Sequence, residues 1–189
     1  MLLTLALVSC TGQAQPGGSN TAVEKPAAPG VSAPVDRNPT AAELGRTESA
    51  NLIASGEEVP AALQIRQGYS LYVPKEGWWL DKEGPEDGFA YEDCWESIRR
   101  DDVELCVRCY TGVTREEAQN RFLRDKNDYL FEDLMGEELF GWDERDGEYL
   151  TFYMEERGDC VYVVYWEYPA QEERWGGLLA EMAHSVQFS

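Results

Sequence analysis

The stretch EYLTFYMEERGDCVYVVYWEYP, residues 148–169, decides the fold of this chain. It contains two runs rich in β-branched and aromatic residues, the usual composition of strands, and Gly158-Asp159 between them is a tight-turn signal. A second such signal, Asp146-Gly147, separates the first run from an apolar segment upstream. We therefore predict an antiparallel meander of three strands, at about 137–143, 148–156 and 160–168.

One helix is predicted before this meander in the sequence and another after it. Thr114 and Glu117 have the spacing of a capping box, in which each side chain accepts a hydrogen bond from the backbone N–H of the other, and the helix should end near Lys126. Residues 127–136 show no clear pattern. After the meander, residues 170–184 are expected to form a helix with a single apolar stripe. The stripe consists of Trp175, Leu178, Leu179, Met182 and Val186.

Further strands are predicted upstream of the helix that Thr114 caps. Residues 68–74 read as a strand, residues 76–79 as a short extended piece and residues 84–88 as a loop. A hairpin follows, with arms at 89–98 and 103–111. Its second arm alternates between two sets of positions, which predicts one face in the core and one in solvent. The sets are Val103, Leu105, Val107, Cys109 and Glu104, Cys106, Arg108, Tyr110. We therefore expect an α+β domain with a largely antiparallel sheet flanked by helices.

The first third of the chain has a different composition. All 22 aromatic residues lie at or beyond Tyr69, so the chain before it lacks core material. Residues 11–40 hold five of the nine prolines and few large apolar side chains, which is too little burial to offset chain entropy. A short helix is expected within residues 41–59. We predict a flexible, disordered tether over residues 10–62 and a globular domain over residues 63–189.

The chain begins with MLLTLALVSC, an apolar run that ends in a cysteine. The run Leu2–Val8 is too short to span a bilayer. Leu7-Val8-Ser9-Cys10 resembles the lipobox of bacterial lipoproteins, at which a signal peptide is removed and the cysteine is acylated. Residues 1–9 lack the Lys or Arg usual in such a signal, so we expect the signal peptide to be truncated at its start. The resemblance implies a protein anchored in the cell membrane by lipid on Cys10, facing outside the cytoplasm.

Three segments of the predicted domain resemble one family. They are Tyr69–Pro74 with Gly77-Trp78, Val161–Pro169 and Met182–Phe188. In order and type they look like the PsbP-like α/β/α sandwich of small bacterial lipoproteins, over about residues 65–189. The resemblance implies the fold and a non-catalytic domain that binds a protein or small ligand, and it brings no catalytic motif.

Charge restricts the partners. The chain has 16 Lys+Arg against 36 Asp+Glu and a formal charge of -20, which argues against nucleic acid and anionic membrane surfaces. Its one histidine, His184, excludes a multi-His metal site and argues against a histidine-activated nucleophile; we expect it to have a local structural role. We predict no cofactor, no resident metal and a monomer.

Two other functions stay open beside non-catalytic binding. One is a glycan-acting hydrolase that uses a pair of carboxyl groups, one with a raised pKa. The other is Ca²⁺ binding, although the acidic turn at Trp142–Gly147 fails as an EF-hand loop because Trp142 would stand at its first ligand position. Arg157-Gly158-Asp159 matches the tripeptide that integrins bind, but a hairpin turn favours Gly and Asp at these positions without any such partner.

Tryptophans are the candidates for a binding platform, since exposed aromatic rings supply contact area at low entropy cost. Trp78, Trp79 and Trp142 lie near predicted loops or strand ends and are the weak binding candidates. The other three, Trp95, Trp166 and Trp175, fall on strand or helix stripes and are predicted to be core residues.

Four cysteines remain after Cys10. They are Cys94, Cys106, Cys109 and Cys160. An even number in an exported domain favours disulfides. Zinc is disfavoured, because the sulfurs of Cys106 and Cys109 point to opposite faces of a strand and no second CxxC motif exists.

The register of the predicted hairpin selects one disulfide. Directly opposed residues of antiparallel strands share a face, so core-facing Trp95 must oppose another core-facing residue. A three-residue turn at 99–101 satisfies this condition. It sets Trp95 opposite Leu105, Glu92 opposite Arg108 and Cys94 opposite Cys106. We therefore predict a Cys94–Cys106 disulfide, with the other two cysteines either paired or left as buried thiols.

Overall fold

The computed structural model describes residues 38–85, 88–133 and 138–189. The predicted signal peptide at 1–9, the lipidation site Cys10 and the first part of the predicted linker lie outside the described residues. No helix within those described ranges is long and apolar enough to cross a bilayer.

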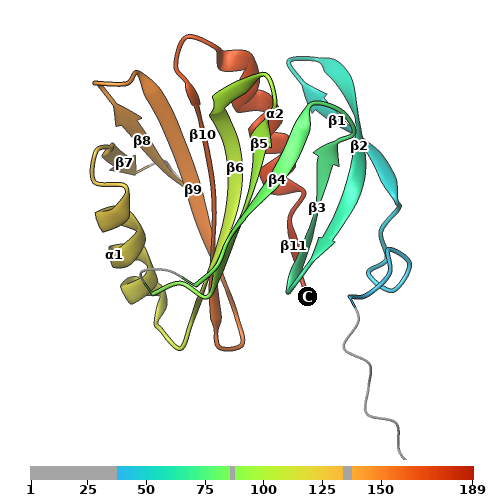
Figure 1. The fold of residues 1–189 in the computed structure, drawn as a ribbon, viewed down its shortest axis with the longest axis horizontal. Coiled ribbons are helices and arrows are strands. Elements are labelled where there is room, and N and C mark those ends of the chain that lie inside the picture. The colour runs from blue at the N-terminus through green and yellow to red at the C-terminus, as the bar shows by residue number, and fades with distance from the viewer. Residues whose placement is uncertain (1–37, 86–87, 134–137) are drawn as a thin grey trace, which may run out of the picture. The chain divides into compact units, whose positions relative to one another are not determined.

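A seven-stranded antiparallel sheet forms the centre of the domain (Figure 1). Its strands are β4 (Trp78–Glu83), β5 (Tyr91–Ser97), β6 (Arg100–Thr111), β7 (Leu130–Asp133), β8 (Leu139–Asp143), β9 (Glu148–Arg157) and β10 (Cys160–Pro169). Their spatial order is β4-β5-β6-β10-β9-β8-β7. The predicted meander is β8-β9-β10, and both hairpin turns place a glycine at positive φ, Gly147 and Gly158.

A second sheet of four strands stands beside the first. Its strands are β1 (Ser49–Ala54), β2 (Glu57–Arg66), β3 (Tyr69–Pro74) and β11 (Gln187–Phe188), in the order β1-β2-β3-β11. The C-terminal strand belongs to this sheet, because β11 pairs with β3. Arg66 joins the two sheets: its guanidinium donates two hydrogen bonds of 3.0 Å to the carboxylate of Asp93 on β5.

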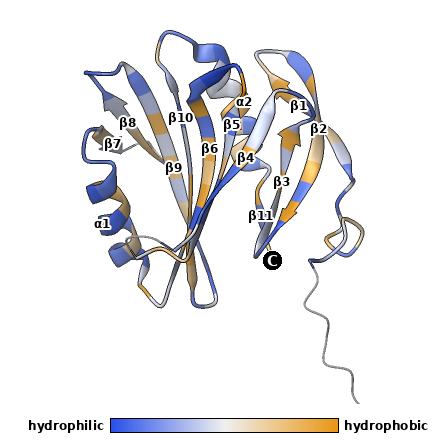
Figure 2. Ribbon diagram, viewed as in Figure 1, coloured by the Kyte–Doolittle hydropathy of each residue, from blue (hydrophilic) through white to orange (hydrophobic). Residues whose placement is uncertain are grey.

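Two helices cover opposite faces of the large sheet, which confirms the α+β layering. Helix α1 (Arg115–Asp125) has the predicted capping box of Thr114 and Glu117. Helix α2 (Glu173–His184) packs against β6 and β10 on one side and against β1 and β3 of the small sheet on the other. Figure 2 shows the contrast between the largely hydrophilic α1 and the hydrophobic bands of β6.

The large sheet is buried on both faces. The α2 face holds a core of aliphatic and aromatic side chains, among them Trp95, Leu105, Val164, Trp166, Leu179 and Met182. The α1 face holds a second core, which includes Tyr110, Phe122, Phe152, Val163 and Tyr165. The prediction that one side of β6 faces solvent is therefore wrong: Cys106, Arg108 and Tyr110 are buried beneath α1.

The structure corrects the prediction for residues 41–62. The helix expected within 41–59 is a single turn at 41–45, and the chain then forms the β1–β2 hairpin where a tether was predicted. Ser55 and Gly56 both have positive φ, as a two-residue hairpin turn requires. Two of its apolar residues, Leu52 and Ala61, are buried in the core that includes α2. The formation of this hairpin therefore depends on tertiary packing.

Three smaller differences concern element boundaries. Strand β7 falls in the segment without a pattern, and α2 begins at Glu173, three residues later than expected. The hairpin β5–β6 keeps the predicted register up to Glu96 opposite Glu104, and then a bulge sets Ser97 opposite Arg100. The turn is therefore shorter than the predicted three residues.

Candidate functional site

The α1 face contains a buried ion pair at the centre of a charged network. Arg108 on β6 lies directly opposite Glu92 on β5, as the predicted register requires. The guanidinium Nε donates to Glu92 Oε1 at 2.6 Å and Nη2 donates to Oε2 at 3.3 Å. Both side chains are almost fully buried. A two-point contact of this kind fixes the plane of the guanidinium group.

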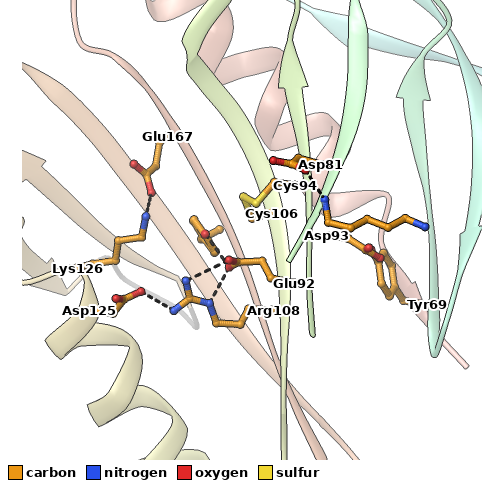
Figure 3. Close-up of a disulfide and its surroundings, with 12 residues drawn as sticks. Tyr69, Asp81, Glu92, Asp93, Cys94, Cys106, Arg108, Asp125, Lys126 and Glu167 are labelled. Carbon is orange, nitrogen blue, oxygen red and sulfur yellow. Dashed lines mark hydrogen bonds and ion pairs between the residues drawn. A yellow bond between two sulfur atoms is a disulfide. The ribbon is translucent and has the colours of Figure 1, made fainter. Parts of the chain in front are cut away.

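Further groups complete the network (Figure 3). Tyr165 donates its hydroxyl to Glu92 Oε1 at 2.7 Å, and Arg108 Nη1 donates to Asp125 Oδ2 at 2.6 Å. The Arg108 guanidinium also lies 4.7 Å from the ring centre of Phe89. Burial alone would lower the pKa of Arg108, but its hydrogen bond to Glu92 and the nearby negative groups raise that pKa above its ordinary value. The guanidinium is therefore a permanent, oriented cation.

A cleft of about 510 Å³ opens above this network. Its lining residues are Glu83, Phe89, Arg108, Tyr110, Arg121, Arg124 and Asp125. Arg121 donates to the carbonyl of Gly88 at 3.1 Å, whereas the Arg124 guanidinium has no partner among the described residues. Three guanidinium groups thus meet in one cleft of a strongly acidic chain.

A smaller pocket on the same face is acidic. Its volume is about 310 Å³, and it is lined by Asp101, Asp102, Glu104, Glu148 and Glu167. Glu104 lies between Glu96 on β5 and Glu167 on β10 in the strand register. Its burial, followed by the charge of Glu167, raises the pKa of Glu104 to about 7. Glu167 is paired with Lys126 and accepts a hydrogen bond of 2.8 Å from the hydroxyl of Tyr129.

The predicted tryptophan candidates do not form one site. Trp79, with 45% of its surface exposed, and Trp78 line a groove of about 270 Å³ beside β4, at one edge of the large sheet. Trp142 lies on β8 near the opposite edge and packs on Tyr149, with ring centres 5.0 Å apart. Trp78 also packs edge-on against Trp175.

The cysteines and the histidine have defined places. Cys94 and Cys106 form the predicted disulfide, with Cα atoms 4.1 Å apart, while Cys109 and Cys160 are thiols. The bonded sulfurs lie close to the Glu92 carboxylate. Because the sulfurs are joined in a disulfide and the carboxylate is paired with Arg108, these three residues are a poor metal site. His184 contacts Glu138, with Nε2 and Oε1 2.6 Å apart, at the end of α2.

The arginine cleft was not among the sequence candidates. One signal for it existed, because the register that selected the disulfide also placed Glu92 opposite Arg108. Its importance was missed since an alternating strand reading assigns every charged position to solvent. The contributions of Arg121 and Arg124 need the docking of α1, which one sequence does not specify.

Comparison with known proteins gives little for function. No family model matches the sequence, and no curated protein matches it. The chain is similar to the solution structure of cyanobacterial PsbP (CyanoP) from Synechocystis sp. PCC 6803, with 14% identity and a TM-score of 0.44 over 65% of this chain and 87% of that chain. It is also similar to a crystal structure from Bacteroides thetaiotaomicron VPI-5482, with 9% identity and a TM-score of 0.38 over 76% of this chain and 49% of that chain. Likeness at this level carries no argument about activity or partners.

Proposed function

We propose that this chain is a non-catalytic binding domain whose arginine cleft receives an anionic group of a partner or small ligand. The observation that carries the proposal is the convergence of Arg108, Arg121 and Arg124 on one cleft in a chain of charge -20. The lining carries three Arg against Glu83 and Asp125, so it has an excess of one positive charge in an otherwise acidic chain, and this favours an anion at this place over the rest of the surface.

The cleft has the chemistry for a carboxylate or a phosphate. Asp125 Oδ2 already accepts a hydrogen bond of 2.6 Å from Arg108 Nη1, so a carboxylate oxygen fits at this donor. Arg124 supplies a guanidinium without a partner among the described residues, and Phe89 supplies an apolar wall. A planar guanidinium group can donate two hydrogen bonds to two oxygens of either anion. Among the described lining residues there is no Ser, Thr, Cys or His, so the cleft lacks the residues of a histidine-activated hydroxyl or thiol nucleophile.

Phosphate titration of the full chain, followed by amide NMR at low ionic strength, tests this function. We expect the shifts to concentrate at α1 and at the end of β6 near Arg108. Arg121→Gln/Arg124→Gln should weaken binding about fivefold, because two solvent-accessible contacts of this kind together contribute about 1 kcal/mol. Arg99→Gln in the β5–β6 turn is the control, since its side chain is exposed and lies at the other end of β6. Equal binding by all variants would contradict the proposal.

We further propose that the domain works outside the cytoplasm on a lipid anchor at Cys10. The support is the lipobox-like Leu7-Val8-Ser9-Cys10 and the proline-rich segment that follows it. Globomycin should cause an unprocessed precursor to accumulate, and Cys10→Ala should move the protein out of the membrane fraction. Unchanged processing and unchanged membrane association would contradict the anchor.

One observation favours a second function, carboxylate-pair hydrolysis of a glycan. Glu104 lies in a pocket beside Glu167, and a pKa of about 7 lets a carboxyl group act as a general acid near neutral pH. Chromogenic glycosides and cell-wall fragments are suitable substrates, with Glu104→Gln as the inactive variant. Equal turnover by the two proteins would remove this function. Calorimetry with Ca²⁺ separates it from cation binding by the same carboxylates.

A further inference from the structure

The two thiols, Cys109 and Cys160, lie on adjacent strands at the end of the large sheet. Tyr162 on β10 lies directly opposite Cys109 on β6, and Cys160 lies opposite Thr111. Side chains two residues apart on a strand share a face. Cys109 and Cys160 are therefore diagonal neighbours on the α2 face of the sheet.

The surroundings of the two thiols differ. Cys109 is 1% exposed, between Tyr91 on β5 and Tyr162 on β10, whereas Cys160 is partly exposed. The Cys160 thiol donates to Asp159 Oδ1 at 3.7 Å. Burial, followed by the charge of Cys160, raises the pKa of Cys109 to about 12.

We propose that Cys109 and Cys160 are a modification site: they close into a second, reversible disulfide that joins β6 to β10. The oxidant is a low-molecular-weight disulfide of the glutathione type. The Cys160 thiolate attacks one sulfur of that disulfide, which forms a mixed disulfide and releases one thiolate. The Cys109 thiolate then attacks the Cys160 sulfur and releases the second thiolate. Two protons and two electrons leave the protein, and the oxidant is reduced to two thiols.

The order of the two steps follows from exposure. An oxidant reaches Cys160, which has exposed surface, before Cys109, which has almost none. The buried Cys109 thiol ionises with difficulty. Once Cys160 carries the mixed disulfide, however, the attack of Cys109 on it is intramolecular, and the high effective concentration of the neighbouring thiol compensates for its small ionised fraction. Cys160 is therefore the attacking residue and Cys109 the resolving residue.

The second bond should be easier to reduce than the first. Cys94 and Cys106 are both buried, so a reductant has little access to their bond, whereas Cys160 is partly exposed. Diagonal positions are typically about 7 to 8 Å apart, at the limit of what a disulfide spans, so closure requires the start of β10 to move. Cys160 is the first residue of β10 and follows the Gly158-Asp159 turn, where the backbone has room to adjust.

Thiol mapping of the folded full chain tests the proposal. The chain is treated with oxidised glutathione, alkylated without reduction and digested. We expect a Cys109–Cys160 peptide beside the Cys94–Cys106 peptide. Cys109→Ser should stop at glutathione on Cys160, and Cys160→Ser should leave Cys109 as a free thiol. The two variants are matched controls, because each removes one sulfur and keeps the Cys94–Cys106 disulfide.

Graded reduction then tests the difference between the two bonds. Low concentrations of dithiothreitol should open Cys109–Cys160 before Cys94–Cys106. Recovery of Cys109 and Cys160 both alkylated after oxidation, or glutathione on Cys109 in the Cys160→Ser variant, would overturn the proposal. Simultaneous opening of both disulfides would overturn the expectation that the second bond is easier to reduce.

Discussion

The two faces of the seven-stranded sheet are both buried and each holds an arginine–carboxylate pair, but the two pairs are placed differently. The α2 face packs aliphatic and aromatic side chains such as Trp166 and Leu179, and its Arg66–Asp93 pair joins the two sheets. The α1 face packs an aromatic core around the Arg108–Glu92 ion pair, and the arginine cleft and the acidic pocket both open on it. A buried ion pair is weak evidence for stability on either face, but the Arg108 pair lies at a cleft that a ligand could enter. The charged groups that a ligand could contact therefore lie on the α1 face.

Breaking the ion pair should have the largest effect on stability. Arg108→Met leaves the carboxylate of Glu92 buried without its cation, and we expect a loss of about 3 to 5 kcal/mol in the free energy of unfolding. Urea unfolding measures it. The double variant Arg108→Met/Glu92→Leu removes both charges and should recover much of the loss. A double variant as unstable as the single one would show that the pair itself stabilises the fold.

A cavity on the α2 face should lower stability and leave binding intact. Leu179→Ala removes a fully buried side chain from α2, and we expect a loss of about 3 kcal/mol. Because α2 lies on the face opposite the cleft, phosphate affinity of the folded protein should not change. A parallel loss of affinity would show that the two faces are not independent.

Neutralising Glu104 should stabilise the protein in a pH-dependent way. Its pKa is about 7 in the folded protein and near 4.5 in the unfolded chain, so the folded state binds the proton more tightly. The contribution of this proton to the free energy of unfolding is complete below pH 4.5 and is lost as the pH rises through 7. Glu104→Gln should therefore raise the unfolding free energy by ~2 kcal/mol at pH 8 and change it little at pH 4.

Thermal unfolding at the two pH values measures this effect. Glu156→Gln, at an exposed position on β9, is the matched control for the removal of one negative charge. Equal effects of the two substitutions at pH 8 would mean that net charge, and not the buried position of Glu104, explains the gain.

The smallest expected effect concerns the cap of α1. Thr114 accepts a hydrogen bond from the backbone N–H of Glu117 at 3.2 Å, and Thr114→Ala should cost about 1 kcal/mol. Amide hydrogen exchange should rise in α1 more than in α2. Uniform exchange in both helices would argue that α1 has no independent stability.

Local signals in the sequence predict the parts of the fold that depend on neighbouring residues. The turns at Gly147 and Gly158 define the meander, and Thr114 with Glu117 marks the start of α1. The Cys94–Cys106 disulfide followed from register, because one face of β5 and β6 had to match. These features need no information from distant parts of the chain.

Features that depend on distant packing were missed. The β1–β2 hairpin offers few large apolar side chains, and Leu52 and Ala61 become core residues only in the packed domain, where α2 lies against β1. The candidate site was missed for a related reason. The strand pattern predicts that Arg108 faces solvent. Only the docking of α1 covers it and brings Arg121 and Arg124 to the same cleft.

The most direct measurement is phosphate affinity after removal of the carboxylate that occupies the cleft. Asp125 pairs with Arg108 while 52% of its side chain is exposed, and it lies at the C-terminal end of α1, where the helix dipole disfavours negative charge. Titration calorimetry of Asp125→Asn should show phosphate binding about fivefold tighter than in the unaltered chain, equivalent to about 1 kcal/mol. Asp128→Asn is the control, since Asp128 pairs with Arg145 on the surface. Equal affinity in Asp125→Asn and the control, or no phosphate binding in either, would contradict the assignment of this cleft as an anion site.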